Sequence, residues 1–298
     1  MEWWLAYLAI GATVGFLAGL LGIGGGAIMV PLLVMLFEAQ GLPRTHVLHL
    51  AVGTAMATIL FTSVSSVRAH AMRGAIRWDI ARRITPGILA GGLVGSGIAA
   101  FIPTAAFAAL FTAVIYVAAT SMLLDRQPKP SRQPPGWAGM FGAGFVVSAL
   151  SAFAAIGGAF MTVPFMLWCN VAMLPAIGTA AAIGFPIALS SSLGFMLTGL
   201  RAAGLPPYSA GFVFLPALAG IVAASMLMAP VRAATAHRLP TKWLKRIFAG
   251  LFPPDDSDRR PADNGADDTL ARGAARSPRS LTGMILNSAP SWRRLPWH

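Results

Sequence analysis

Residues 22–26, Gly-Ile-Gly-Gly-Gly, interrupt an apolar stretch over Trp3–Phe37. A near-copy at residues 155–159, Ala-Ile-Gly-Gly-Ala, interrupts a second apolar stretch over Trp137–Trp168, and Val-Pro follows both motifs. Hydrocarbon tolerates irregular backbone only where protein or a water-filled cavity satisfies the freed N–H and C=O groups. Glycine breaks at matched positions of two apolar stretches are therefore typical of a transporter binding site.

Close helix packing is the alternative interpretation of these glycines. Small residues spaced along apolar helices let two backbones approach without any ligand. A single cluster fits either interpretation, but its recurrence in register with a following Val-Pro favours a break made for a ligand.

The composition predicts a polytopic membrane protein. Hydrophobic residues make up 56% of the 298 residues and charged residues only 11%, with a mean hydropathy of +0.69. Soluble domains carry about 25% charged residues. Spanning helices need about 20 apolar residues, and the unbroken runs that qualify are Val47–Val67, Ile84–Ile102, Phe107–Leu124, Ile177–Leu197 and Tyr208–Met228. The first segment has no basic region or cleavage site of a signal peptide and is expected to stay in the membrane.

The basic residues indicate orientation rather than a nucleic-acid partner. Up to Phe252 the chain has 15 Lys and Arg against four acids, and the bases lie in loops between apolar runs. Such a bias marks the cytoplasmic side of membrane proteins. Three basic clusters share the cytoplasmic side if each glycine-broken stretch is a helical hairpin, and only Arg44 and Arg201 then remain outside.

The chain is an internal duplication. Val52-Gly53-Thr54-Ala55 matches Ile177-Gly178-Thr179-Ala180, and Ser65-Ser66 matches Ser190-Ser191 at the same offset. We expect a first membrane repeat over 1–125, a cytoplasmic linker over 126–136, a second repeat over 137–252 and a disordered tail over 253–298. A hairpin plus three single crossings reverses the next half, so the fold class expected is an all-α membrane protein built as an inverted repeat. Residues 242–252 begin a last helix too short to span.

These motifs resemble the sulfite exporter TauE/SafE family. The resemblance rests on residues 15–26, the segment from His49 to Thr54, the serines near 65 with the following His70 and Arg73, and Gly178-Thr179 with Gly184-Phe185-Pro186. It covers about residues 5–252, with Ala155 and Ala159 as departures from the glycine motif. The resemblance implies a permease of the bacterial inner membrane that exports sulfite, a sulfonate or a related organic anion. A channel or a membrane sensor of sulfur compounds on the same fold stays open as the alternative.

The candidate site residues follow from the chemistry of an anion. Broken helices present N-terminal N–H groups and the positive end of a helix dipole, and glycine lets a ligand approach the backbone. Hydroxyl groups can donate hydrogen bonds to oxyanion oxygens, although in membrane helices they more often bond to nearby backbone. The expected substrate-binding residues are Gly24, Gly25, Gly26, Gly157, Gly158, Thr54, Thr179, Ser65, Ser66, Ser190, Ser191 and, as a gate or ligand, His49. For His49, an interfacial position facing lipid headgroups is the alternative.

Other classes of function lack their residues. No Asp or Glu lies within a spanning run, so a carboxylate proton relay has no candidate. The chain has no HExxH motif, no Walker A motif and no nucleophile beside a base. Its one cysteine is Cys169. Neither an enzyme nor a metal site is therefore expected. No cofactor is expected. The expected partners are a small anion and the lipid bilayer, with homo-oligomerisation left open.

Overall fold

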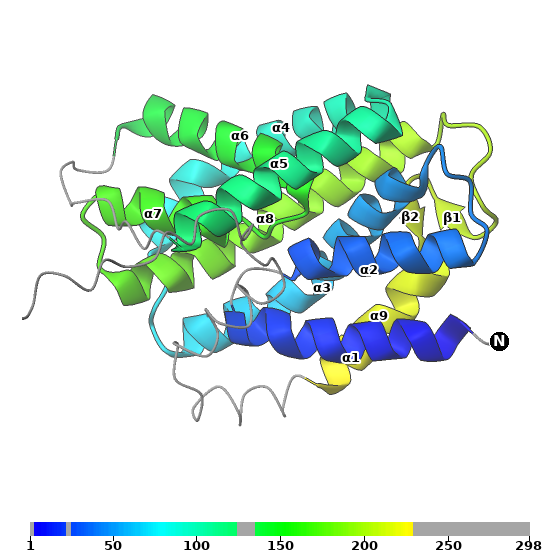
Figure 1. Ribbon diagram of the computed structural model, residues 1–298. Coiled ribbons are helices and arrows are strands. Elements are labelled where there is room, and N and C mark those ends of the chain that lie inside the picture. Colours follow the sequence, from blue (N-terminus) through cyan, green and yellow to red (C-terminus); the bar gives the residue numbers. More distant parts are fainter. Residues whose placement is uncertain (1–2, 22–24, 124–134, 229–298) are drawn as a thin grey trace, which may run out of the picture. The chain divides into compact units, whose positions relative to one another are not determined.

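The computed structural model describes residues 3–21, 25–123 and 135–228, and most of these residues are helical (Figure 1). By its contacts the chain divides into residues 1–253 and 254–298, and every described residue belongs to the first unit. The expected helical architecture is confirmed for this part of the chain. The expected tail, residues 242–252 and most of the linker lie outside it.

The helices and strands follow one another in this order. The first half of the chain contains α1 (Trp3–Leu21), α2 (Gly26–Ala39), α3 (Val47–Met72), α4 (Trp78–Phe101) and α5 (Thr104–Leu123). The second contains α6 (Trp137–Ala154), α7 (Ala159–Trp168), α8 (Met173–Gly199), the two-residue strands β1 (Ser209–Ala210) and β2 (Val213–Phe214), and α9 (Leu215–Leu227).

Both glycine motifs break a helix, as the sequence predicts. Helix α2 begins after Gly25 and α7 begins after Gly158, and both residues take the left-handed conformation, with φ of 70° and 55°. Residues with a β-carbon rarely adopt this backbone conformation, whereas glycine does so at no steric cost. The two halves therefore restart their second helix by the same backbone turn.

Each break turns the chain back on itself, and the two hairpins open toward opposite ends in Figure 1. Helix α1 begins and α2 ends at one end, whereas α6 begins and α7 ends at the other. With 10 residues, α7 is about 15 Å long and reaches only halfway through a hydrocarbon layer of about 30 Å. The second break lies beside Ile187, in the middle of α8 (Met173–Gly199).

Four helices of the described chain, α3, α4, α6 and α8, are long and apolar enough to cross a membrane. One expected span is wrong in extent. Helix α9 starts at Leu215 rather than near Tyr208, because residues 209–214 form a ribbon in which Ser209 pairs with Phe214. Tyr208 and Gly211 have positive φ, which ends regular structure on both sides of β1.

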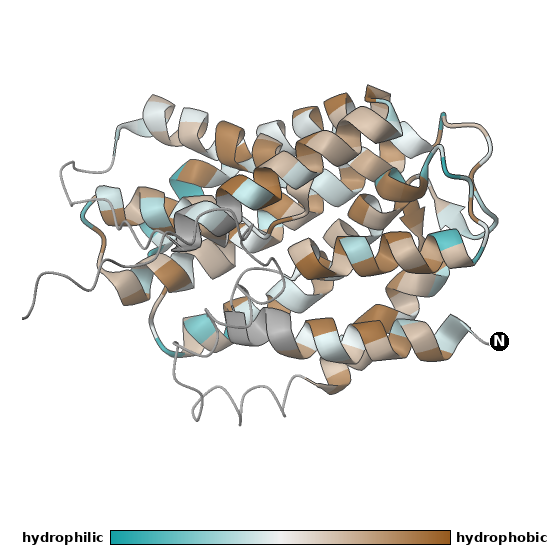
Figure 2. Cartoon of the chain, in the orientation of Figure 1, coloured by the Kyte–Doolittle hydropathy of each residue, from teal (hydrophilic) through white to brown (hydrophobic). Residues whose placement is uncertain are grey.

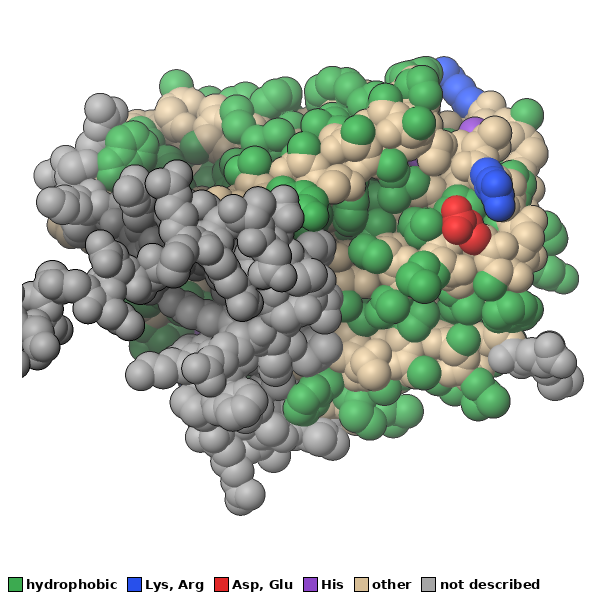
Figure 3. Space-filling view, in the orientation of Figure 1, with side chains coloured by type: hydrophobic (Ala, Val, Ile, Leu, Met, Phe, Trp, Pro, Cys, Tyr) green, Lys and Arg blue, Asp and Glu red, His purple; other side chains and the backbone are tan. Residues whose placement is uncertain are grey.

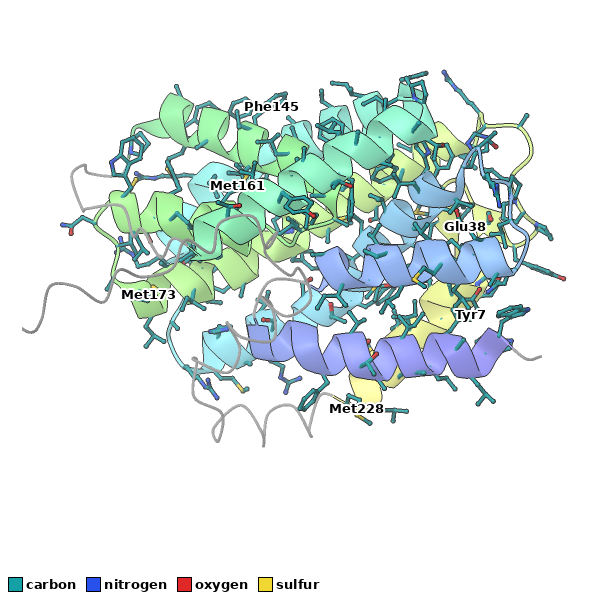
Figure 4. All side chains as sticks on the ribbon, in the orientation of Figure 1. Tyr7, Glu38, Phe145, Met161, Met173 and Met228 are labelled. Carbon is teal, nitrogen blue, oxygen red and sulfur yellow. The ribbon has the colours of Figure 1, made fainter. Side chains whose placement is uncertain are left out.

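The outer face of the helices is apolar. Figure 2 shows hydrophobic residues along every helix, and in Figure 3 the described side chains of this face are mostly hydrophobic, with the few charged ones gathered near the end where α2 stops. Glu38, labelled in Figure 4, is an exposed residue at this end. A soluble protein rarely exposes so large an apolar area, so lipid is the expected surrounding.

Glycines bring the helices of different halves into backbone contact. Gly87, Gly91 and Gly95 follow one another turn by turn along α4, where it packs on α6. A β-carbon on Gly91 would lie 2.1 Å from the carbonyl oxygen of Phe145, which Figure 4 labels. Helix α9 packs on α1 in the same way, since a β-carbon on Gly11 would lie 2.6 Å from the carbonyl oxygen of Ile221.

This packing predicts different effects for two alanine substitutions in one helix. Gly91→Ala forces α4 away from the Phe145 backbone and should destabilise the protein by about 1–3 kcal/mol, the usual cost of overpacking. Gly97→Ala, with nothing within 4 Å of its new methyl group, should leave stability unchanged or slightly higher. Thermal unfolding in detergent measures both, and equal midpoints for the two variants would contradict the close α4–α6 contact.

Candidate substrate site

The two glycine breaks meet inside the unit. A β-carbon built on Gly26 would lie 1.8 Å from the carbonyl oxygen of Ala155, so only glycine fits at the start of α2. Ala155 itself ends α6 in the left-handed conformation, with φ of 50°. Residues far apart in the sequence, one in each predicted repeat, thus form a single contact between two broken helices.

The second break also lies against the middle of α8. A β-carbon on Gly184 would approach the carbonyl oxygen of Gly157 to 3.8 Å, and one on Gly158 would lie 2.3 Å from the Cδ1 atom of Ile187. Pro186 stands between these two α8 residues and donates no backbone hydrogen bond. The backbone around this break is therefore packed against α8, and contact with protein is one of the two settings in which irregular backbone is tolerated at membrane depth.

Helices α2 and α7 both begin in this region and have free N–H groups in their first turns. In α7 the carbonyl oxygen of Gly158 accepts from the N–H groups of Met161 and Thr162 at 3.2 and 2.9 Å. The N–H groups at the very start of α7 have no acceptor within the helix. The same arrangement occurs at Gly25, at the start of α2. Free N–H groups and the positive end of a helix dipole make such a terminus suited to an anion.

Each Gly-Thr pair contacts a connection in the other half of the chain. Thr54 Oγ1 accepts a hydrogen bond from Phe214 N at 3.0 Å, and a β-carbon on Gly53 would lie 2.2 Å from the carbonyl oxygen of Phe212. These partners follow α8. The contact therefore ties the first repeat to the chain between α8 and α9.

The second Gly-Thr pair makes the same contact in return. Thr179 Oγ1 accepts from Arg77 N at 2.9 Å, and a β-carbon on Gly178 would lie 2.2 Å from the carbonyl oxygen of Ala75. Ala75 and Arg77 follow α3, just as Phe212 and Phe214 follow α8. Both threonines are fully buried. The hydroxyl oxygen of each threonine accepts a hydrogen bond from a backbone N–H group. That the threonines line a solute pathway stays a prediction.

The serines take several environments. Ser65 is exposed and donates to the carbonyl oxygen of Thr62 at 2.8 Å, and Ser66 is half-buried. Ser190 donates to the carbonyl oxygen of Pro186 at 2.9 Å. The hydroxyl group of Ser191 is buried, and it has no hydrogen-bond partner among the described residues. The structure thus places the α8 serines one turn beyond the second break and leaves Ser65 at the surface.

The His49 side chain lies inside the protein and does not face lipid headgroups. Its side chain is 2% exposed, so the interfacial alternative is wrong. Nε2 lies 3.1 Å from the carbonyl oxygen of Ala99, which can only accept, so this nitrogen carries the proton. Nδ1 is buried without a partner in the described part of the chain. The ring packs beside Phe107 and Phe212, with centroids 4.9 and 5.2 Å away.

The described carboxylates are at the surface. Glu38 is exposed at the end of α2. Asp79, in the first turn of α4, accepts two hydrogen bonds from Arg77 at 2.9 and 2.7 Å, and this pairing raises the pKa of Arg77. Within residues 3–21, 25–123 and 135–228 no group of His, Cys, Asp and Glu could hold a metal ion. Gly24 lies outside the described residues.

Sequence reasoning missed two groups of residues near this region. Phe212 and Phe214 complete the contact with Gly53 and Thr54, but nothing in an apolar run distinguishes them. Ser148 and Ser151 of α6 are buried close to the second break. Their spacing of three on one helix face was a visible signal.

Comparison with known proteins identifies the family. The model of the sulfite exporter TauE/SafE family matches residues 7–252, which is most of the chain and includes both glycine breaks. The chain belongs to the sulfite exporter TauE/SafE family. Members of this family are membrane transporters, which are not enzymes. No solved structure matches the chain.

Several relatives carry the same general description. A "Probable membrane transporter protein" of Haemophilus influenzae is 32% identical over 249 residues, covering 82% of this chain and 93% of the relative. The "Probable membrane transporter protein YdhB" of Bacillus subtilis is 23% identical over 62% of this chain and 76% of its own length. YunE of the same organism, described in the same words, is 38% identical over 30% of this chain and 31% of its own length.

The threonine contacts predict an effect on folding. Thr54→Val and Thr179→Val leave the buried N–H groups of Phe214 and Arg77 without an acceptor, which should cost about 1–3 kcal/mol each. Thr→Ser at either position keeps the hydroxyl group and should restore most of this stability. Thermal unfolding in detergent provides the measurement. Unchanged stability in both valine variants, combined with lost transport, would instead assign the threonines to the solute pathway.

Proposed function

We propose that this TauE/SafE protein is a carrier that exports small anions, such as sulfite, a sulfonate or a related organic anion, across a bacterial inner membrane. The observation that carries the proposal is the meeting of two broken helices. Helices α2 and α7 both start from a left-handed glycine, and Gly26 touches Ala155 of the opposite break. Their free N–H groups and dipoles form the positive region that a buried anion needs.

The charge distribution supports an anion rather than a cation. The described carboxylates lie on exposed side chains, so no described carboxylate offsets the helix N-termini. A cation carrier would need a carboxylate or a set of carbonyl ligands at membrane depth. Backbone N–H groups offer no such ligand, because they only donate.

We further propose that the two repeats are inverted relative to each other. The hairpins open toward opposite ends (Figure 1), and each Gly-Thr pair holds the connection that follows the other pair's helix. Both features are those of two copies related by an axis in the membrane plane. Carriers with this symmetry reach two access states by exchanging the conformations of their halves.

The connections support an orientation for the membrane. The loop that contains Arg44 and the loop that contains Arg201 lie at one end in Figure 1, whereas the turn after α3 lies at the other. Arginines surround that turn: Arg68, Arg73, Arg77, Arg82 and Arg83. The positive-inside bias assigns the turn to the cytoplasm and leaves Arg44 and Arg201 outside.

Valine substitutions test the proposed site. Gly25→Val and Gly158→Val place a β-branched side chain at positive φ, where it is strained, and beside the N–H groups proposed to hold the anion. Transport should fall to background in both variants. Gly97→Ala is the control for a glycine in a helix outside the breaks, and it should transport normally. Normal flux in either valine variant at matched protein level removes that break from the site.

The proposed charge of the solute predicts electrogenic export. An inside-negative potential supplies about 2.3 kcal/mol per charge per 100 mV to an anion that leaves the cytoplasm. Efflux from proteoliposomes should therefore rise with the potential and be indifferent to sodium. The measurement is efflux of sulfite with the potential set by potassium and valinomycin.

Two outcomes of this experiment count against the proposal. Efflux that ignores the potential but collapses without a pH gradient indicates proton coupling, with His49 as the next residue to substitute. Failure of unlabelled anion to drive counterflow of labelled anion indicates a channel or a sensor, because only a carrier exchanges its substrate.

A further inference from the structure

The His49 ring lies at a junction of several elements. His49 belongs to the first turn of α3, and its ring packs against Phe107 of α5 and Phe212 of the turn between β1 and β2. Nε2 lies 3.1 Å from the carbonyl oxygen of Ala99, near the end of α4. In Figure 1 these elements meet at the end of the molecule that the proposed orientation assigns to the outside.

One nitrogen of this buried ring has no partner. Nε2 carries the proton, so Nδ1 is an acceptor, and within the described residues nothing donates a hydrogen bond to it. Buried polar atoms are almost always paired, because an unpaired one destabilises the fold. Histidine is also no part of the repeated pattern, since the matching position of the second half carries Leu174. Packing alone does not explain this imidazole.

A second proton would change this junction. Protonated Nδ1 becomes a donor, and the ring becomes a buried cation. The faces of Phe107 and Phe212 and the carbonyl end of α4 favour a positive charge, but none of the described groups accepts a hydrogen bond from Nδ1. A buried donor without an acceptor is costly. The charged ring therefore needs water, which reaches it only if the β1–β2 ribbon, residues 209–214, moves.

His49 is the group whose protonation changes the interior of this junction. Of the described titratable groups, the half-buried His46 faces it, with ring centroids 6.2 Å apart. The residues that pack on it from α4, α5 and the β1–β2 ribbon are not ionisable. The charged side chains of this end, Glu38, Arg44 and Arg201, are exposed, so water weakens their effect on the ring.

The β1–β2 ribbon is the part of the junction that can move. Its strands have two residues each. Phe212 N donates to the carbonyl oxygen of Phe195 at 3.1 Å, and Phe214 N donates to Thr54 Oγ1 at 3.0 Å. A short ribbon held by few hydrogen bonds opens at a lower free energy than the long helices around it.

We propose that Nδ1 of His49 is a proton-binding site that opens the outer end of the protein. A proton from the outer solution favours a state in which the β1–β2 ribbon has moved away from α3 and water accepts the Nδ1–H hydrogen bond. The neutral ring favours the closed state of this structure. The inference rests on the proposed function, because an exporter releases its solute through this end. The proton returns to the outer solution, so export remains driven by the potential.

Thiol labelling of the ribbon tests the proposal. In full-length protein with Cys169→Ala, Val213→Cys places a thiol at a position that is 1% exposed, and Leu200→Cys places one at a 70% exposed position of the same end. A membrane-impermeant maleimide is added to proteoliposomes while the outer pH is lowered from about 7.5 to about 5.5, the range in which imidazole titrates. Labelling of Val213→Cys relative to Leu200→Cys, which corrects for thiol reactivity, should rise at least about threefold.

Neutral substitutions assign the response. His49→Gln keeps an N–H group for the Ala99 carbonyl oxygen but stays uncharged, so the labelling ratio should become independent of pH. His49→Asn provides the same measurement if His49→Gln does not fold. His46→Gln is the control for the neighbouring imidazole and should keep the rise.

The outcomes separate this inference from the proposed function. A ratio that ignores pH in the protein with His49, or that rises equally in the neutral His49 variants, overturns the proton site while anion transport stands. A rise that His46→Gln abolishes assigns the proton to His46 and also overturns it. Labelling needs no solute, so an acid response together with absent anion flux removes the proposed function and leaves the proton site.

Discussion

Two exchanged backbone contacts hold the halves of this transporter together. A β-carbon on Gly53 would lie 2.2 Å from the carbonyl oxygen of Phe212. A β-carbon on Gly178 would lie at the same distance from the carbonyl oxygen of Ala75. The neighbouring threonine accepts an N–H hydrogen bond in both cases. Each contact joins one half of the chain to a connection in the other half. Helices α3 and α8, which carry the two Gly-Thr pairs, also pack against each other.

Lipid explains why glycine has this role. Apolar surface gains little by leaving a bilayer, so helices associate through close packing and hydrogen bonds rather than through the hydrophobic effect. The α4–α6 contact follows this rule, with Gly87 against the backbone of Phe141 and Gly95 against that of Ala149. The same small residues are poor choices in a soluble core, since they bury little area. Glycine content is thus a packing requirement here, and only the left-handed positions require its backbone freedom.

The sequence predicted the breaks, because a left-handed restart and the following Val-Pro leave a local mark. The broken stretches, most spans and the paired Gly-Thr motifs were also visible in the periodicity and repetition. It could not show that Thr54 binds the backbone of Phe214, since that contact depends on how two distant connections cross. His49 was ambiguous for a related reason. Its burial comes from Phe107 of α5 and from Phe212 in the turn between β1 and β2, which are distant in the sequence and leave no local signal. The extent of α9 was wrong because an apolar ribbon and an apolar helix have the same composition.

The departure at Ala155 makes the two breaks chemically different. A non-glycine residue in the left-handed region costs about 1–2 kcal/mol, and Ala155 is held there by full burial and by contact of its carbonyl group with Gly26. The first break carries Gly22 at the matching position of the sequence. The two breaks are therefore unequal, because the sequence places a methyl group on the α-carbon at the second break and none at the matching position of the first.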